Sequence, residues 1–188
     1  MEAFPDYDHD TRAPDPLPPP GSCDCHLHVF ADAARYPPAA ARTYDPPAAT
    51  FADLERMHRA LGVERAVIVQ ASIYGTDNRL MVDTIAGRKN YRGVAVIDDA
   101  TTDAELARMN AAGVRAARFN FAKFLGLVPS AETFRRSVAR VKPLGWHVKI
   151  FGDFDEYKGL FAQSGGFDIP SSWSVGAAFT PIRSFAQG

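Results

Sequence analysis

The sequence predicts an α/β fold with a parallel sheet, and three observations support this prediction. Short apolar segments alternate five times with segments of helical periodicity between residue 23 and about residue 165. Segments such as RAVIVQAS are almost continuously apolar in the middle, which is typical of strands covered on both faces. Glycine or proline separates many of the segments, and strands that alternate with helices form βαβ units with parallel strands.

The expected strands share short runs that are rich in apolar and β-branched residues. The first, CDCHLHVF, differs from the others because it carries two histidines. Each strand is followed by enough chain for one helix before the next strand, as a parallel connection requires. Strands are expected at residues 23–30, 65–72, 91–98, 114–121 and 146–152.

The expected helices have apolar stripes and recognisable ends. TFADLERMHRALG repeats its apolar residues at helical spacing and stops at Gly62. Thr102 and Glu105 have the spacing of a capping box, which marks the start of a helix. Helices are expected at residues 50–62, 77–87, 102–113, 131–145 and 153–165.

The chain divides into three parts. Residues 1–21 are rich in proline and are expected to form an extended arm, and residues 22–163 are expected to form the β/α domain. Residues 164–188 show neither a strand pattern nor a helical stripe. A shifted reading frame is one explanation of this atypical tail. The codons of Pro170, Ser171, Ser172 and Trp173, with G in the free third positions, would encode a run of valines in a shifted frame.

Composition narrows the possible partners and the compartment. The formal net charge of −1 gives no indication of binding to nucleic acid or to an anionic membrane. The 188 residues contain no apolar run of 18 residues, so no transmembrane helix is expected. The first residues lack the basic start and the apolar segment of a signal peptide, so none is expected there. Cys23 and Cys25 point the same way on one strand and are expected to be reduced thiols. A cytoplasmic protein that acts on a small molecule is therefore expected.

The alternation of strands and helices alone is compatible with two sheet architectures. One is an open doubly wound sheet, and the other is a (β/α)8 barrel. No GxGxxG motif follows the first strand, so a dinucleotide-binding fold has no support. A complete barrel needs about 250 residues, which is more than the 188 of this chain.

His26 and His28 are the first candidate site residues. They have the same parity on the first strand, so in a barrel both would point inward near its carboxyl end, where the active sites of barrels lie. Neutral imidazoles at this place bind a metal or form hydrogen bonds with a substrate. The alternative is a pair of core histidines that bond to the backbone. His58 is expected to be a solvated helix residue. His147 is expected to face away from the barrel axis or to pack between the layers.

Several motifs together resemble one family. CDCHLHVF, ERAVIVQASIYGTDN, AAGVRAARFNF and PLGWHVKIF stand in the order found in the amidohydrolase superfamily. They resemble its amidohydrolase-2 family, in the branch of the 2-pyrone-4,6-dicarboxylate lactonases. This resemblance implies a (β/α)8 TIM barrel of the metal-dependent hydrolase type, truncated here after about five βα units.

The resemblance also implies an activity and a set of site residues. The family opens a lactone of a carboxylated ring by means of an activated water molecule. His26 and His28 would be the catalytic residues and would polarise the scissile carbonyl. They would also hold a zinc ion if a metal is used, although the resemblance favours catalysis without metal. Tyr44, Ser72 and Arg118 would bind the substrate, Arg118 through its planar fork.

The sequence also departs from the family pattern. Lys123 and Phe124 stand where a second arginine is expected, and Phe151 stands in place of a tyrosine. A histidine in a DHxGR motif and an aspartate in a GTDWPH-like motif, the expected base, are missing from the 188 residues. The chain alone is therefore expected to be inactive or only weakly active.

Two other functions remain open at this point. One is a decarboxylase of the same superfamily, which would need zinc at His26 and His28. The other is a non-catalytic fragment whose open sheet edges pair with a second chain, since exposed strand edges favour self-association.

Overall fold

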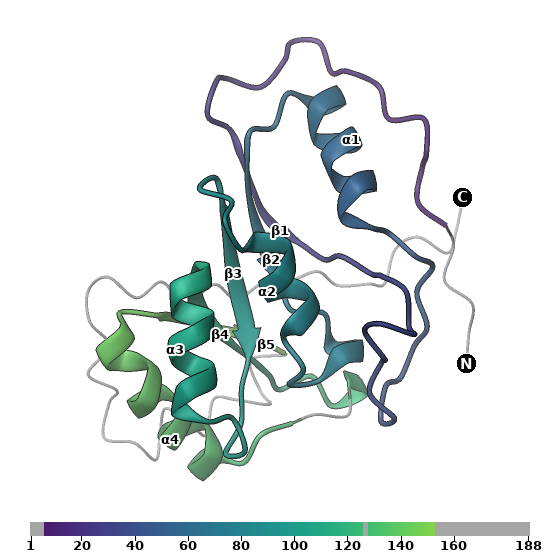
Figure 1. The fold of residues 1–188 in the computed structure, drawn as a ribbon. Helices are drawn as coiled ribbons and strands as arrows, with labels where there is room; N and C mark the ends of the chain where they lie inside the picture. The colour runs from purple at the N-terminus through teal and green to yellow at the C-terminus, as the bar shows by residue number, and fades with distance from the viewer. Residues whose placement is uncertain (1–5, 126–127, 153–188) are drawn as a thin grey trace.

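The computed structural model describes residues 6–125 and 128–152, which form a five-stranded parallel sheet with helices on one side (Figure 1). The strands lie side by side in chain order. They are β1 (Cys23–Leu27), β2 (Arg65–Val69), β3 (Tyr91–Val96), β4 (Val114–Asn120) and β5 (His147–Phe151). The helices are α1 (Phe51–Leu61), α2 (Arg79–Ile85), α3 (Asp103–Ala112) and α4 (Ala131–Val141).

Local sequence signals fix where α1 and α3 begin and end. Thr50 and Thr102 each form a capping box with the acidic residue three positions later, so backbone donors of the first turn are satisfied. The two helices end at Gly62 and Gly113, whose φ angles of 70° and 115° lie in the left-handed region. Glycine adopts this conformation without a steric penalty, and each helix therefore stops where the sequence predicts.

The sheet separates two apolar clusters. The larger cluster lies between the sheet and the helices and takes one face of each strand, for example Ile68 of β2. The smaller cluster consists of Val69, Val94 and Ala116, with Val67 packed against it. Because neighbouring residues of a strand point to opposite faces, the smaller cluster lines the inner face of the sheet. We call this face the inner face below.

The sheet is curled into a half-barrel. β1 and β5 are the two outermost strands, yet Nζ of Lys149 on β5 lies 3.0 Å from Nδ1 of His26 on β1. Two side chains from opposite edges of a flat five-stranded sheet do not meet, because neighbouring strands are about 4.8 Å apart. The curl therefore turns the inner faces of both edge strands toward each other.

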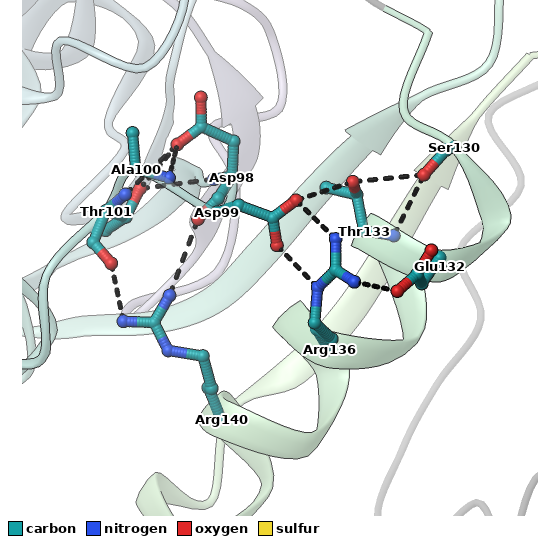
Figure 2. Close-up of polar contacts among 9 residues, drawn as sticks. All are labelled: Asp98, Asp99, Ala100, Thr101, Ser130, Glu132, Thr133, Arg136 and Arg140. Carbon is teal, nitrogen blue, oxygen red and sulfur yellow. Dashed lines mark hydrogen bonds and ion pairs between the residues drawn. The ribbon is translucent and has the colours of Figure 1, made fainter.

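Ionic contacts fix the loop after β3 against α4 (Figure 2). Asp99 accepts hydrogen bonds from Arg136 at 2.9 and 2.7 Å and from the hydroxyl of Thr133 at 2.8 Å. Arg140 donates to the carbonyl oxygen of Thr101, and Arg136 also pairs with Glu132. These contacts hold the loop at the carboxyl end of the sheet, beside the site described below.

The structure confirms the α/β fold for the described residues and corrects two expectations about histidines. His58 is buried, because it lies one turn after Leu54 on the face of α1 that covers the sheet, and its Nε2 contacts Asp24 at 3.3 Å. His147 shares the inner face with Lys149, since Val148 packs in the helix-side core. Parity along β5 therefore overturns the outward placement of His147.

Two expected segments, the helix at 153–165 and the tail at 164–188, lie outside the described residues. Residues 6–21 of the expected arm contain neither helix nor strand. Among the described residues, no helix is long and apolar enough to cross a membrane.

Replacement of Gly93 by alanine is expected to destabilise the fold. A Cβ atom at this position of β3 would overlap Sδ of Met81 and lie 2.8 Å from Cδ1 of Ile85, both on α2. Overpacking of this kind costs about 1–3 kcal/mol. Urea unfolding of Gly93→Ala should show this loss, and the same substitution in a Met81→Ala background should cost less, because the overlapping atom is gone. Equal stability of Gly93→Ala and the parent chain would contradict this packing.

Candidate active site

Side chains that carry chemistry collect at the carboxyl end of the inner face. His26 lies on β1 and His28 follows that strand directly, with ring centroids 5.3 Å apart and the rings nearly perpendicular. Arg118 on β4 is aligned in register with Lys149 on β5. This end of a parallel barrel is where active sites lie, so the predicted histidines and the predicted arginine occupy the same region.

The backbone fixes the tautomer of His28. Its Nδ1 lies 2.8 Å from the carbonyl oxygen of Val69, and a carbonyl oxygen only accepts hydrogen bonds. Nδ1 therefore carries the proton, and in the neutral ring Nε2 presents a lone pair. Burial lowers the pKa of His28 below its usual 6.5, and the positive charges of Arg118 and Lys149 act in the same direction. The ring is therefore neutral at pH 7, with an acceptor nitrogen.

Lys149 gives His26 the opposite tautomer. A charged ammonium only donates, so its contact with Nδ1 of His26 at 3.0 Å leaves the ring proton on Nε2. Loss of water around the ring, followed by the charge of Lys149, lowers the pKa of His26 to about 4. His26 thus presents a neutral N–H donor at Nε2, and His28 presents an acceptor at the equivalent atom.

Tyr44 and Ser72, to which the family resemblance assigns substrate binding, lie close together. The phenol oxygen of Tyr44 lies 3.0 Å from the hydroxyl oxygen of Ser72. Ser72 opens a short 3-10 helix, Ser72–Tyr74, directly after β2, and Tyr44 belongs to the long loop between β1 and α1. The two hydroxyl groups form a polar edge next to the carboxyl end of β2.

Arg118 is buried without an anionic partner among the described residues. Its side chain is 5% exposed, its guanidinium lies over the ring of Phe151 at 4.7 Å, and its Nε has no hydrogen-bond partner. Burial lowers the pKa of Arg118 to about 10, so the group is still positive at neutral pH. A buried charge is costly unless it is paired, and this site therefore favours an anionic ligand.

A cleft of about 540 Å³ opens beside Arg118 at the carboxyl ends of β3 and β4. Its walls include Asn120, Tyr74 and Asp98, whereas His26 and His28 lie outside it. Asn120 is 3% exposed, and its Oδ1 has no hydrogen-bond partner. Arg118 and Asn120, two neighbouring inward residues of β4, therefore each contribute a buried polar atom without a hydrogen-bond partner next to the cleft.

The described residues alone do not fit a divalent metal ion. No group of three His, Cys, Asp or Glu side chains occurs among them in a metal-binding arrangement. The proton on Nε2 of His26 and the positive charges of Lys149 and Arg118 further oppose a cation at this place. A metal here would need acidic ligands from outside this part of the chain.

The sequence pattern missed Lys149 and Asn120. Asn120 lies two residues after Arg118 on β4, and Lys149 is aligned with Arg118 on β5, so all three side chains point to the inner face. The alternation of inward and outward residues in RFN and WHVKIF indicates this placement. Lys149 was overlooked because its relevance depends on the curl that brings β5 opposite β1. Asn120 was overlooked because an amide is ordinary in a strand until its burial is known.

Comparison with known proteins identifies the family. The amidohydrolase family model Amidohydro_2 matches residues 23–185. The chain belongs to this family. It is 42% identical over 135 residues to a 2-pyrone-4,6-dicarboxylate hydrolase of Comamonas testosteroni, covering 71% of this chain and 44% of that protein. It is 32% identical over 155 residues to a 4-sulfomuconolactone hydrolase of Rhizobium radiobacter, covering 81% and 52%.

A solved structure agrees with this family assignment. The crystal structure of a probable 2-pyrone-4,6-dicarboxylic acid hydrolase of Acinetobacter baumannii, with citric acid bound, matches with a TM-score of 0.67 and 25% identity. The match covers 84% of this chain and 57% of that one. The chain spans about half the length of the curated relatives it matches, and its five strands correspond to part of the amidohydrolase barrel.

The two histidines are expected to stay neutral under mildly acidic conditions. Nitrogen-detected NMR should show the proton of His28 on Nδ1 and that of His26 on Nε2, with His26 titrating near pH 4. A histidine pKa that is lower in the folded than in the unfolded state makes stability fall as the pH drops from 6.5 toward 4. His26→Gln should flatten this fall, and an unchanged pH dependence would contradict the assignment.

Proposed function

We propose that this chain forms the substrate-binding and carbonyl-polarising part of a hydrolase that opens a lactone of a carboxylated ring by means of activated water. Membership of the amidohydrolase family and the lactone-opening names of two relatives support this proposal. The observation that carries it is the neighbouring histidine pair, with one N–H donor and one acceptor nitrogen. The pair lies beside a buried arginine that has no acidic partner in the part of the chain that the structure describes.

Substrate binding would rest on the charge of Arg118. Its planar guanidinium matches the two oxygens of a carboxylate, and the pairing restores the partner that the buried charge lacks. Tyr44 and Ser72 would add hydroxyl donors to the same or a neighbouring carboxylate. Together these contacts would hold the ring so that its ester carbonyl faces the histidines.

The two tautomers assign different roles to the histidines. His26 would donate from Nε2 to the carbonyl oxygen and stabilise the negative charge that develops there. His28 would accept a proton from water at Nε2 while the water oxygen bonds to the carbonyl carbon. The ring C–O bond would then break, and the same proton would pass from His28 to the leaving ring oxygen. Polarisation by both histidines, as the sequence predicts, would require a proton on each Nε2, and the bond from His28 to Val69 opposes this.

Proton transfer is the weakest part of the proposed reaction. A well-placed general base contributes about 10²–10⁴-fold to a rate, and a low pKa makes His28 a poor base. The motifs DHxGR and GTDWPH, which the resemblance associates with catalysis, do not occur in the 188 residues. The chain alone is therefore expected to bind the substrate far better than it hydrolyses it.

The proposal is tested by separating binding from turnover. Calorimetry should detect binding of 2-pyrone-4,6-dicarboxylate to the purified chain, and Arg118→Gln should weaken it by about tenfold or more, as expected for a lost charged hydrogen bond. Arg115→Gln is the matched control, because Arg115 lies on the same strand but is exposed. Ring opening, followed by the ultraviolet absorbance of the pyrone, should be slow and unaffected by a chelator.

Two results would contradict the proposal. One is no binding of the pyrone to a chain that unfolds cooperatively. The other is equal weakening by Arg118→Gln and Arg115→Gln, which would mean that the arginine acts only through stability.

A further inference from the structure

Lys149 is a second cation on the inner face, and the proposed function does not yet use it. It stands opposite Arg118 in the register of β4 and β5, so the two side chains are neighbours on the same face. Among the residues that the structure describes, no carboxylate forms an ion pair with either of them. Two like charges at neighbouring positions repel each other, and an anion between them removes that repulsion.

The contact with His26 does not exhaust the hydrogen-bonding capacity of Lys149. An ammonium carries three N–H donors, and the bond to Nδ1 of His26 uses one of them. The remaining two are directed elsewhere in the half-buried surroundings of the side chain. Burial and the charge of Arg118 lower the pKa of Lys149, which indicates that no nearby group compensates its charge fully.

We infer that Lys149 binds a second acidic group of the ligand and so determines specificity for doubly charged ring lactones over singly charged ones. This inference rests on the proposed function and deepens it. Arg118 takes one carboxylate through its planar fork. Lys149 takes the second acidic group as a point charge, which suits a flat carboxylate and a tetrahedral sulfonate equally well.

The position of Lys149 also compensates for a departure in the sequence. Lys123 and Phe124 stand where a second arginine would be expected from the family resemblance, and both side chains are exposed. A second cationic contact is therefore supplied from β5 instead of from the loop after β4. Lys149 further links specificity to chemistry, because the ammonium that binds the second acidic group is the same one that keeps the Nε2 proton on His26.

The test compares two probes that differ by one carboxylate, 2-pyrone-4,6-dicarboxylate and 2-pyrone-6-carboxylate. Calorimetry should show that Lys149→Gln weakens binding of the dicarboxylate by about tenfold or more and leaves the monocarboxylate within about twofold. Glutamine removes the charge and retains an N–H donor, on a side chain one bond shorter than that of lysine. Arg118→Gln should weaken both probes.

Two matched variants test whether the change in affinity depends on the position of the lost charge. Lys89→Gln removes the same charge from an exposed position between α2 and β3, at the opposite end of the sheet, and should change neither affinity. Lys123→Gln tests the alternative lysine. The inference is overturned if Lys123→Gln, rather than Lys149→Gln, removes the preference for the dicarboxylate, or if both probes respond equally to Lys149→Gln.

The outcomes also separate this inference from the proposed function. If the unaltered chain binds both probes and Lys149→Gln leaves their ratio unchanged, only the role of Lys149 fails. If the unaltered chain binds neither probe, the lactone function fails together with it.

Discussion

The candidate site depends on the curl of the sheet, and one contact shows this curl directly. His26 and Lys149 belong to the two edge strands, yet their nitrogens lie 3.0 Å apart. The inner apolar cluster of Val69, Val94 and Ala116 supports the curve from within, since these small residues allow the strands to approach. Without the curl, the histidines and the cations would lie on separate edges and would share no ligand.

The curl also explains why positive charge prevails at the site. The carboxyl end of the inner face gathers the cations of Arg118 and Lys149 and the imidazoles of His26 and His28. Two acidic residues near these strands have other partners, since Asp24 contacts His58 and Asp99 pairs with Arg136. Burial and the shared positive field together keep both imidazoles neutral. The same field that binds an anion therefore also preserves the neutral tautomers on which the proposed chemistry rests.

The sequence predicted the order of elements well because each is specified locally. Capping boxes at Thr50 and Thr102 and glycine at Gly62 mark helix ends without reference to the rest of the chain. Parity alone placed His26 and Arg118 correctly. Lys149 and His58 were missed because their environments are created by residues far away in sequence, 123 positions away for Lys149 and 34 positions away for His58. Periodicity gives the face of the element on which such a residue lies, but it does not show which residues lie opposite that face.

The tautomers give a physical reason to separate this site from a metal site of the same superfamily. Two histidines on one strand bind a metal only when both present lone pairs toward the same point. Here the backbone of Val69 leaves a lone pair on Nε2 of His28, while Lys149 leaves a proton on Nε2 of His26. With a lysine at this position of β5, the histidine pair presents one N–H donor and one acceptor nitrogen, which is the arrangement that the proposed function requires. One side chain therefore sets both the positive charge and the tautomer of His26, so the inferred role of Lys149 in ligand binding and its effect on the histidine pair would change together on substitution.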